Sequence, residues 1–194
     1  LKTVEYISKS RTPYLPYSCI ILDEIMRVTN PRNIICSISG LREGSLSIDY
    51  FKDVKESEIF YKALEKVAQK RGDLGSNYKK YYDFIQPVFE GNEHFNKKLL
   101  YLACVLSHMD WGLGAFQKAE LVFQETINTP LLRLTHKERI QLALSCYWRY
   151  CSIKYNPKIE YLTFLNNNEI FSSKQVGAAL RFSQSLTSIS TIFL

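Results

Sequence analysis

The sequence predicts a mainly α-helical chain, in which a short segment of mixed helix and strand precedes a helical bundle. From about Lys55 onward, apolar residues recur every three or four positions, which is typical of helices that bury one face. Before Lys55, one such stripe is followed by two short runs that are typical of strands. No apolar run approaches the ~18 residues that a membrane-spanning helix needs. We therefore expect a globular chain without a membrane span, divided near residues 49–55 into segments 1–50 and 51–194.

The first segment is expected to hold one helix and two strands. Residues 15–28 carry an apolar stripe at helical spacing, and Pro31 ends the helix because proline disfavours helical geometry in the residue before it. Residues 33–39 form an isoleucine-rich run that predicts a buried strand, and residues 46–50 alternate as a second strand does. Because isolated strand pairs are marginal in water, we expect this segment to self-associate or to be loosely ordered unless a larger αβ layer covers it.

The second segment is expected to contain only helices. Apolar periodicity predicts four of them, over residues 59–68, 78–89, 99–106 and 116–127. Thr135 and Glu138 have the spacing of a capping box and open a long helix that continues to Cys151. Ser172 and Gln175 allow a cap for the last helix. The residues expected on its inner face are Val176, Ala179, Leu180 and Ser183.

Charge and cysteine content limit the partners and the compartment. With 25 Lys and Arg against 19 Asp and Glu, the chain carries a net charge of +6, which favours a polyanionic partner because neutralised phosphates release counterions. No nucleic-acid motif accompanies the basic residues, so no specific nucleic-acid partner is expected. The five cysteines form no C-x-x-C pair and lie in apolar stretches, which indicates free core thiols and a reducing cytoplasm.

Several segments, taken in their order along the chain, resemble one protein family. Ser10-Arg11-Thr12-Pro13, a helix, and then a run through Gly40-Leu41-Arg42-Glu43-Gly44 are similar to the end of the catalytic region of exopolyphosphatases and guanosine pentaphosphatases. Residues 98–111 resemble a helix of that family's HD-like domain. Residues 119–123, residues 143–150 with Trp148-Arg149-Tyr150, and residues 181–187 resemble its later segments. The resemblance covers most of the chain.

The resemblance implies an HD-domain-like helical bundle over residues 51–194, preceded over residues 1–50 by a remnant of an actin-like (ribonuclease H-like) α/β domain. Members of the family hydrolyse terminal phosphoanhydride bonds of polyphosphate or of guanosine pentaphosphate. Their magnesium, phosphate loops and catalytic base belong to an actin-like region that would precede Leu1, and we expect both ends of this chain to be cuts within a longer protein. The resemblance therefore implies no catalytic residue and no bound metal in this chain, with magnesium only in the parent enzyme.

The expected role is to extend a cleft for a long polyanion and to help form a homodimer, while the absent half carries out hydrolysis. The alternative, from a different class, is a non-catalytic helical module that binds a nucleotide or a protein.

The turn at Gly40, Arg42 and Gly44 is the first candidate site, for substrate binding. Two glycines permit a tight turn with exposed amides, and Arg42 can bind a phosphate through two hydrogen bonds. The alternative is a strand-ending turn in which Arg42 and Glu43 make structural ion pairs.

Ser107 and His108 form the second candidate site. An active HD phosphohydrolase needs a His-Asp dyad and further ligands, because a metal-bound hydroxide attacks the phosphate. The matching pair here is Ser-His, which lacks the carboxylate, and neither His94 nor His136 has ligand spacing to His108. We therefore expect no metal site, and a partly buried structural histidine at position 108.

Overall fold

The structure is a computed structural model, and it confirms a mainly helical chain. It describes residues 7–34, 40–42, 44–45, 66, 69, 78–91, 96–108, 112–129, 131, 134–155, 157 and 159–190, the last four by their backbone alone. Every regular element in these residues is a helix, and none of these helices is both long and apolar enough to cross a bilayer. The chain divides into two compact units, Leu1–Cys36 and Ser37–Leu194. The predicted boundary near residues 49–55 lies outside the described residues and stays a prediction.

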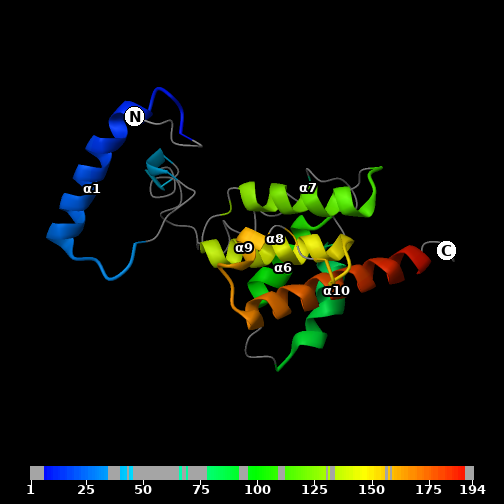
Figure 1. The fold of residues 1–194 in the computed structure, drawn as a ribbon. Helices are drawn as coiled ribbons and strands as arrows, with labels where there is room; N and C mark the ends of the chain where they lie inside the picture. Colours follow the sequence, from blue (N-terminus) through cyan, green and yellow to red (C-terminus); the bar gives the residue numbers. More distant parts are fainter. Residues whose placement is uncertain are drawn as a thin grey trace. The chain divides into compact units, whose positions relative to one another are not determined.

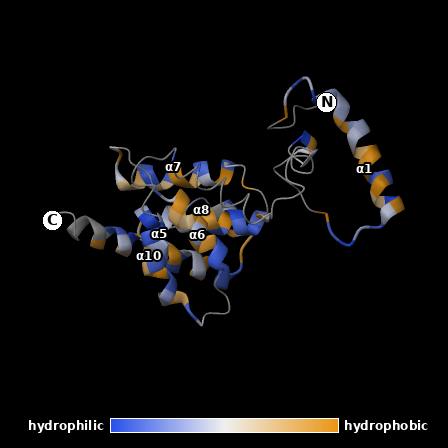
Figure 2. Ribbon diagram, turned by 180° about the vertical axis from the view of Figure 1, so that it is seen from behind, coloured by the Kyte–Doolittle hydropathy of each residue, from blue (hydrophilic) through white to orange (hydrophobic). Residues whose placement is uncertain are grey.

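The first unit contains a single long helix in its described residues. A 3₁₀ turn, η1 (Thr12–Tyr14), leads into α1 (Leu15–Thr29), as predicted. Asn30 ends the helix in the left-handed region, with φ 43°, and its amide donates to the carbonyl of Met26 at 2.8 Å. No residue of α1 is buried, although hydrophobic residues lie along its length (Figure 2).

The actin-like remnant expected over residues 1–50 is not supported. Asn33 and Ile34, the described part of the first predicted strand, are not in a strand, and no strand occurs elsewhere among the described residues of this segment. The remainder of that run and the second predicted strand lie outside the described residues. So does most of the helix predicted over 59–68, of which Lys66 is described and helical, as is Gln69 just beyond it.

The second unit is a bundle of helices that matches the other predicted periodicities. Its elements are α5 (Tyr78–Ile85), η2 (Gln86–Phe89), α6 (Lys97–Leu106), α7 (Ala115–Asn128), α8 (His136–Tyr150), α9 (Ile159–Leu162) and α10 (Asn167–Ser190). Pro87 stands where α5 tightens into the 3₁₀ turn η2, since proline lacks the amide that would continue the α-helix. The helices predicted over residues 78–89, 99–106 and 116–127 are thus confirmed.

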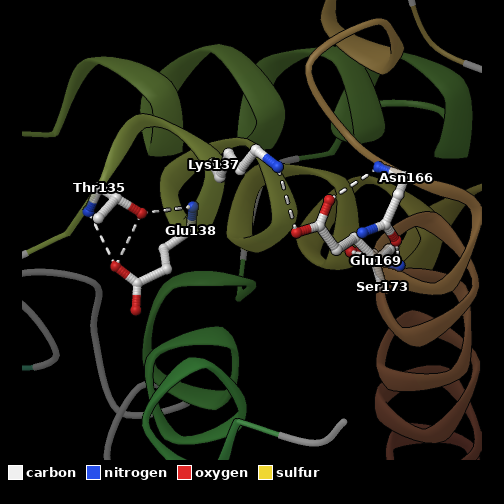
Figure 3. Close-up of polar contacts among 6 residues, drawn as sticks. All are labelled: Thr135, Lys137, Glu138, Asn166, Glu169 and Ser173. Atoms are coloured by element: carbon white, nitrogen blue, oxygen red, sulfur yellow. Dashed lines mark hydrogen bonds and ion pairs between the residues drawn. The ribbon is translucent and has the colours of Figure 1, made fainter. Parts of the chain in front are cut away.

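Side-chain caps fix the starts of α6 and α8. The predicted capping box of α8 is confirmed: the Glu138 amide donates to Thr135 Oγ1 at 3.2 Å, and the Thr135 amide donates to Glu138 Oε2 at 2.8 Å (Figure 3). At the start of α6, Asn96 Oδ1 accepts from the amides of Lys98 and Leu99 at 3.0 and 3.3 Å. Both helix starts therefore follow from local sequence.

The start of α10 differs from the prediction. Asn166 and Glu169 form its capping box, with the Glu169 amide donating to Asn166 Oδ1 at 2.9 Å and the Asn166 amide donating to Glu169 Oε2 at 2.7 Å (Figure 3). The cap predicted at Ser172 and Gln175 is wrong, because both residues lie inside the helix that begins at Asn167. The predicted inner face is confirmed, since its residues are buried or half-buried: Val176, Ala179, Leu180 and Ser183.

Helices α6, α8 and α10 run parallel, and their N-terminal ends lie together. The Asn96 side-chain amide donates to the Glu138 carboxylate at 3.4 Å, which joins the starts of α6 and α8. The Lys137 ammonium lies 3.6 Å from the Glu169 carboxylate, which joins the starts of α8 and α10 (Figure 3). At the opposite end of the bundle the C-terminal ends of α6 and α8 meet beside the second half of α10, as described below.

Helix α8 is buried on all sides between two cores. It lies between α7 and α10 (Figure 1), and all residues from 142 to 149 are buried. Leu142 and Cys146 face the first core, which α5, α6 and α10 complete. Ala143, Tyr147 and Trp148 face the second core, which α7 and the residues around Leu165 complete. A helix that is apolar around its circumference is stable only when it is covered in this way.

Gly177 allows α10 to approach α8 closely. A Cβ atom at this position would lie 2.6 Å from Trp148 Cβ and 2.9 Å from the carbonyl oxygen of Ser145. The indole N–H of Trp148 donates to the carbonyl of Tyr155 at 2.8 Å, which holds the ring in place. The contact between the helices, rather than an unusual backbone angle, requires glycine here.

We expect Gly177→Ala to lower the free energy of unfolding by about 1–3 kcal/mol, because two helix backbones must separate to admit the methyl group. This loss would exceed the gain in helix propensity of about 1 kcal/mol. Chemical denaturation followed by circular dichroism measures it. Gly112→Ala is the matched control, since nothing lies within 4 Å of a Cβ atom there. Equal stability of the two variants would contradict the close contact.

Candidate functional site

The C-terminal ends of α6 and α8, together with Gln184 in the second half of α10, bring four polar side chains around one arginine. Arg149 Nη1 donates to Ser107 Oγ at 2.6 Å, Nη2 donates to His108 Nδ1 at 3.3 Å, and Nε donates to Gln184 Oε1 at 3.2 Å. The Tyr150 hydroxyl donates to the carbonyl of Ser107 at 2.8 Å. Arg149 is 2% exposed and Ser107 is completely buried. Residues 107, 149 and 184 are far apart in sequence, so only the folded bundle forms this cluster.

Within the described residues, the buried guanidinium of Arg149 has neutral hydrogen-bond partners and makes no ion pair. The rings of Tyr81 and Tyr150 lie 5.8 and 5.6 Å from its central carbon. Ser107 is the C-terminal cap of α6, and Arg149 lies in the last turn of α8. Helix C-termini carry partial negative charge. The ends of these two helices and the two aromatic faces therefore stabilise the buried cation.

The arrangement around His108 does not fit a metal ion. Because a guanidinium only donates, Nδ1 of His108 is the acceptor and the proton lies on Nε2. The nitrogen that could bind a metal thus faces a permanent positive charge at 3.3 Å. His136 lies at the first turn of α8, at the other end of the bundle, and the described residues contain no metal-binding group of three His, Cys, Asp or Glu side chains. His108 is 6% exposed and is held by Arg149, which agrees with a structural histidine.

The predicted glycine turn has a different conformation from the one expected. Leu41, Arg42, Gly44 and Ser45 are helical, and the Gly44 amide donates to the carbonyl of Gly40 at 3.2 Å. That bond occupies an amide which the predicted turn would offer to a phosphate. Arg42 is exposed, so it is accessible to a ligand. The strand expected before this segment lies mostly outside the described residues, so the strand-ending alternative stays a prediction.

The cysteines divide into buried and exposed thiols. Cys104, Cys146 and Cys151 are buried, as predicted, whereas Cys19 is exposed on α1. Burial raises the pKa of Cys104 to about 12, because a thiolate would lose its hydration there. Cys36 lies outside the described residues. The buried thiols therefore act as small hydrophobic side chains.

Three arginines donate hydrogen bonds at the C-terminal ends of helices, and sequence periodicity does not reveal this. Arg139 donates to the carbonyls of Thr129 and Leu131, which follow α7, and α7 consequently runs antiparallel to α8. Arg181 donates to two carbonyls at the end of α8, and Arg149 occupies the end of α6. Arg139 is 5% exposed, whereas Lys137, two positions earlier in the same helix, is exposed. The one sequence feature that could have indicated the buried position of Arg149 is that it lies between two aromatic residues, Trp148 and Tyr150.

Comparisons with models of protein families, with curated proteins and with solved structures find no match to this chain.

We expect Arg149→Met to lower the free energy of unfolding by about 3 kcal/mol, because Ser107, His108 and Gln184 each lose a buried donor worth about 1 kcal/mol. Urea denaturation followed by tryptophan fluorescence measures the loss. Arg27→Met is the control, since Arg27 is exposed on α1 and its ion pair among the described residues is with the exposed Glu24. Stability equal to that of the unsubstituted chain would show that the cluster does not hold the helix ends together.

We expect His108→Asp to raise the free energy of unfolding by about 1–2 kcal/mol at neutral pH, because it places a carboxylate beside the buried guanidinium. The guanidinium lowers the pKa of that carboxyl in the folded state. The gain is therefore present above the unfolded pKa of about 3.9 and is lost as the pH falls through the folded value. Stability measured against pH for His108→Asp and for the uncharged control His108→Asn tests this. The same profile in both variants would contradict it.

Proposed function

We propose that this chain is the C-terminal part of an exopolyphosphatase-type hydrolase of polyphosphate or guanosine pentaphosphate, with a cytoplasmic location. In this proposal it supplies a polyanion-binding surface and dimer contacts, and its bundle is an HD-like domain without catalytic metal chemistry. The ordered sequence resemblance over most of the chain supports the proposal, and a helical bundle is consistent with it.

The observation that carries the non-catalytic role is the position of Arg149. An HD phosphohydrolase holds its metal at the dyad that corresponds to Ser107 and His108. In this chain a guanidinium donates to both residues, at 2.6 and 3.3 Å. A bound cation would have to displace it. Ser107 is also completely buried, so its hydroxyl is not accessible as a nucleophile.

The opposite end of the bundle supports a polyanion-binding role. The starts of α6, α8 and α10 lie together there, and the amides and dipoles of helix starts favour negative charge. Lys97 and Lys137 are exposed in the first turns of α6 and α8. The carboxylates of Glu138 and Glu169, which lie in the caps, offset part of the positive charge of the helix starts and the lysines. This favours a weak, salt-dependent contact with a chain of phosphates over tight binding of one phosphate.

We expect the chain to bind long polyphosphate without releasing phosphate, and Lys97→Ala with Lys137→Ala to weaken binding. Two fewer neutralised phosphates would reduce the slope of log affinity against log salt by about 1.5. Fluorescence anisotropy with labelled polyphosphate across a salt series measures both effects.

The matched control is Lys80→Ala with Lys154→Ala, which removes the same charge from two other exposed positions. Equal losses in the two double variants would indicate non-specific attraction by net charge. Absence of binding to both polyphosphate and guanosine pentaphosphate, together with binding of another nucleotide or of a protein, would favour the alternative of a non-catalytic interaction module. Magnesium-dependent phosphate release that a substitution in this chain abolishes would overturn the proposal.

A further inference from the structure

Helix α10 carries apolar side chains on two opposite faces. Val176 and Leu180 on its inner face are buried in the first core. The residues on the opposite side, which we call the α10 outer face, recur every three or four positions: Phe171, Gln175, Ala178, Phe182 and Leu186. Phe171 and Phe182 are 61% and 60% exposed. A surface helix that packs on one side only is ordinarily polar on the other side. The apolar residues of the α10 outer face are therefore typical of a helix face that packs against another surface.

An apolar groove adjoins this face. It lies between α10 and the α5–η2 segment and has a volume of about 510 Å³. The ring of Phe84 on α5 lies 6.4 Å from the ring of Phe182, with an angle of 31° between the two planes. Ile85 and Phe89 are buried at its base, and Val88 beside them is 73% exposed. The outer face and the groove thus form one continuous apolar surface.

The exposed apolar area matches one side of a protein interface. Phe84 is 51% exposed and Leu186 is 41% exposed. With about 200 Å² for a fully exposed aromatic side chain and less for Val and Leu, the five large side chains of this surface expose about 500 Å². A standard interface buries about 800 Å² on each partner, of which about 450 Å² is apolar. A single partner of ordinary size would therefore cover the surface.

The charge distribution favours a second copy of the chain as that partner. The chain carries a net charge of +6, so contacts through its lysines would repel a second copy. None of the residues of the α10 outer face is charged, and neither Phe84 nor Val88 is. The surface is thus a place where two copies can meet without bringing like charges together, and where one copy offers the other an equal apolar area.

We propose that the α10 outer face and the adjoining groove are the homodimer interface of this chain. A twofold axis between Ala178 and Phe182 places Phe182 of each copy against Ala178 of the second copy, so that a large side chain meets a small one. The α10 helices then cross antiparallel, with Phe84 and Val88 of each copy at the sides. This inference rests on the dimerisation part of the proposed function and is independent of polyphosphate binding.

Sedimentation velocity over a range of protein concentrations tests the interface. We expect the unsubstituted chain to dimerise, and Phe182→Lys to weaken the dimer by about 30-fold or more, because it places two ammonium groups across the axis. Phe116→Lys is the matched control, since Phe116 on α7 is also 60% exposed but lies away from α10. Circular dichroism establishes that each variant is folded, and Phe171→Lys, at the first turns of α10, replaces Phe182→Lys if that variant does not fold.

Variants of α1 separate this surface from the exposed helix of the first unit. Ile21→Lys with Ile25→Lys places charges on α1, whose side chains are also exposed. A dimer that survives these changes but not Phe182→Lys supports the proposal. A chain that is monomeric at all concentrations, or a dimer that only the α1 variants dissociate, overturns it. Because polyphosphate binding is measured on the same variants, loss of binding with an intact dimer bears on the polyphosphate proposal alone.

Discussion

The parallel arrangement of α6, α8 and α10 is the constraint on which the polar structure of this bundle depends. Parallel helices bring like ends of their dipoles together, which costs energy unless charges of opposite sign accumulate at each end. At the N-terminal end the compensating charges are the carboxylates of Glu138 and Glu169, which lie within the caps. At the C-terminal end they are the guanidinium groups of Arg149 and Arg181, which donate to the cap residue or to the last carbonyls of a helix.

This constraint explains how the buried guanidinium of Arg149 is stabilised by neutral groups among the described residues. From the last turn of α8, Arg149 donates to Ser107 and His108 at the end of α6, at 2.6 and 3.3 Å. Its donation to Gln184 joins these two helix ends to α10. The contacts at this end of the bundle therefore stabilise the fold. Exposed lysines lie at the opposite end, on Lys97 and Lys137, as well as elsewhere on the surface, for example at Lys80 and Lys154.

Helix packing determines which surfaces remain available for partners. Gly177 lets α10 lie against α8 so closely that Trp148 fills the contact. With its inner face fixed in this way, α10 presents Phe171 and Phe182 outward. The lysines Lys97 and Lys137 and the α10 outer face consequently occupy different parts of the bundle, so the proposed polyanion contact and the proposed dimer contact would not compete.

Local sequence alone determined most helices of the bundle and the cap of α8, because hydrophobic period and capping act over a few residues. Thr135 and Glu138 are three positions apart, and their reciprocal bonds need nothing else. The sequence offers two capping patterns for α10, Asn166 with Glu169 and Ser172 with Gln175, each a polar residue followed three positions later by Glu or Gln. The structure uses the earlier one, because a helix extends to the earlier cap when the residues between the two permit it. Only the tertiary structure decided the role of Arg149. Its partners Ser107 and Gln184 lie 42 and 35 positions away, and a buried cation is satisfied by whatever the fold brings within reach.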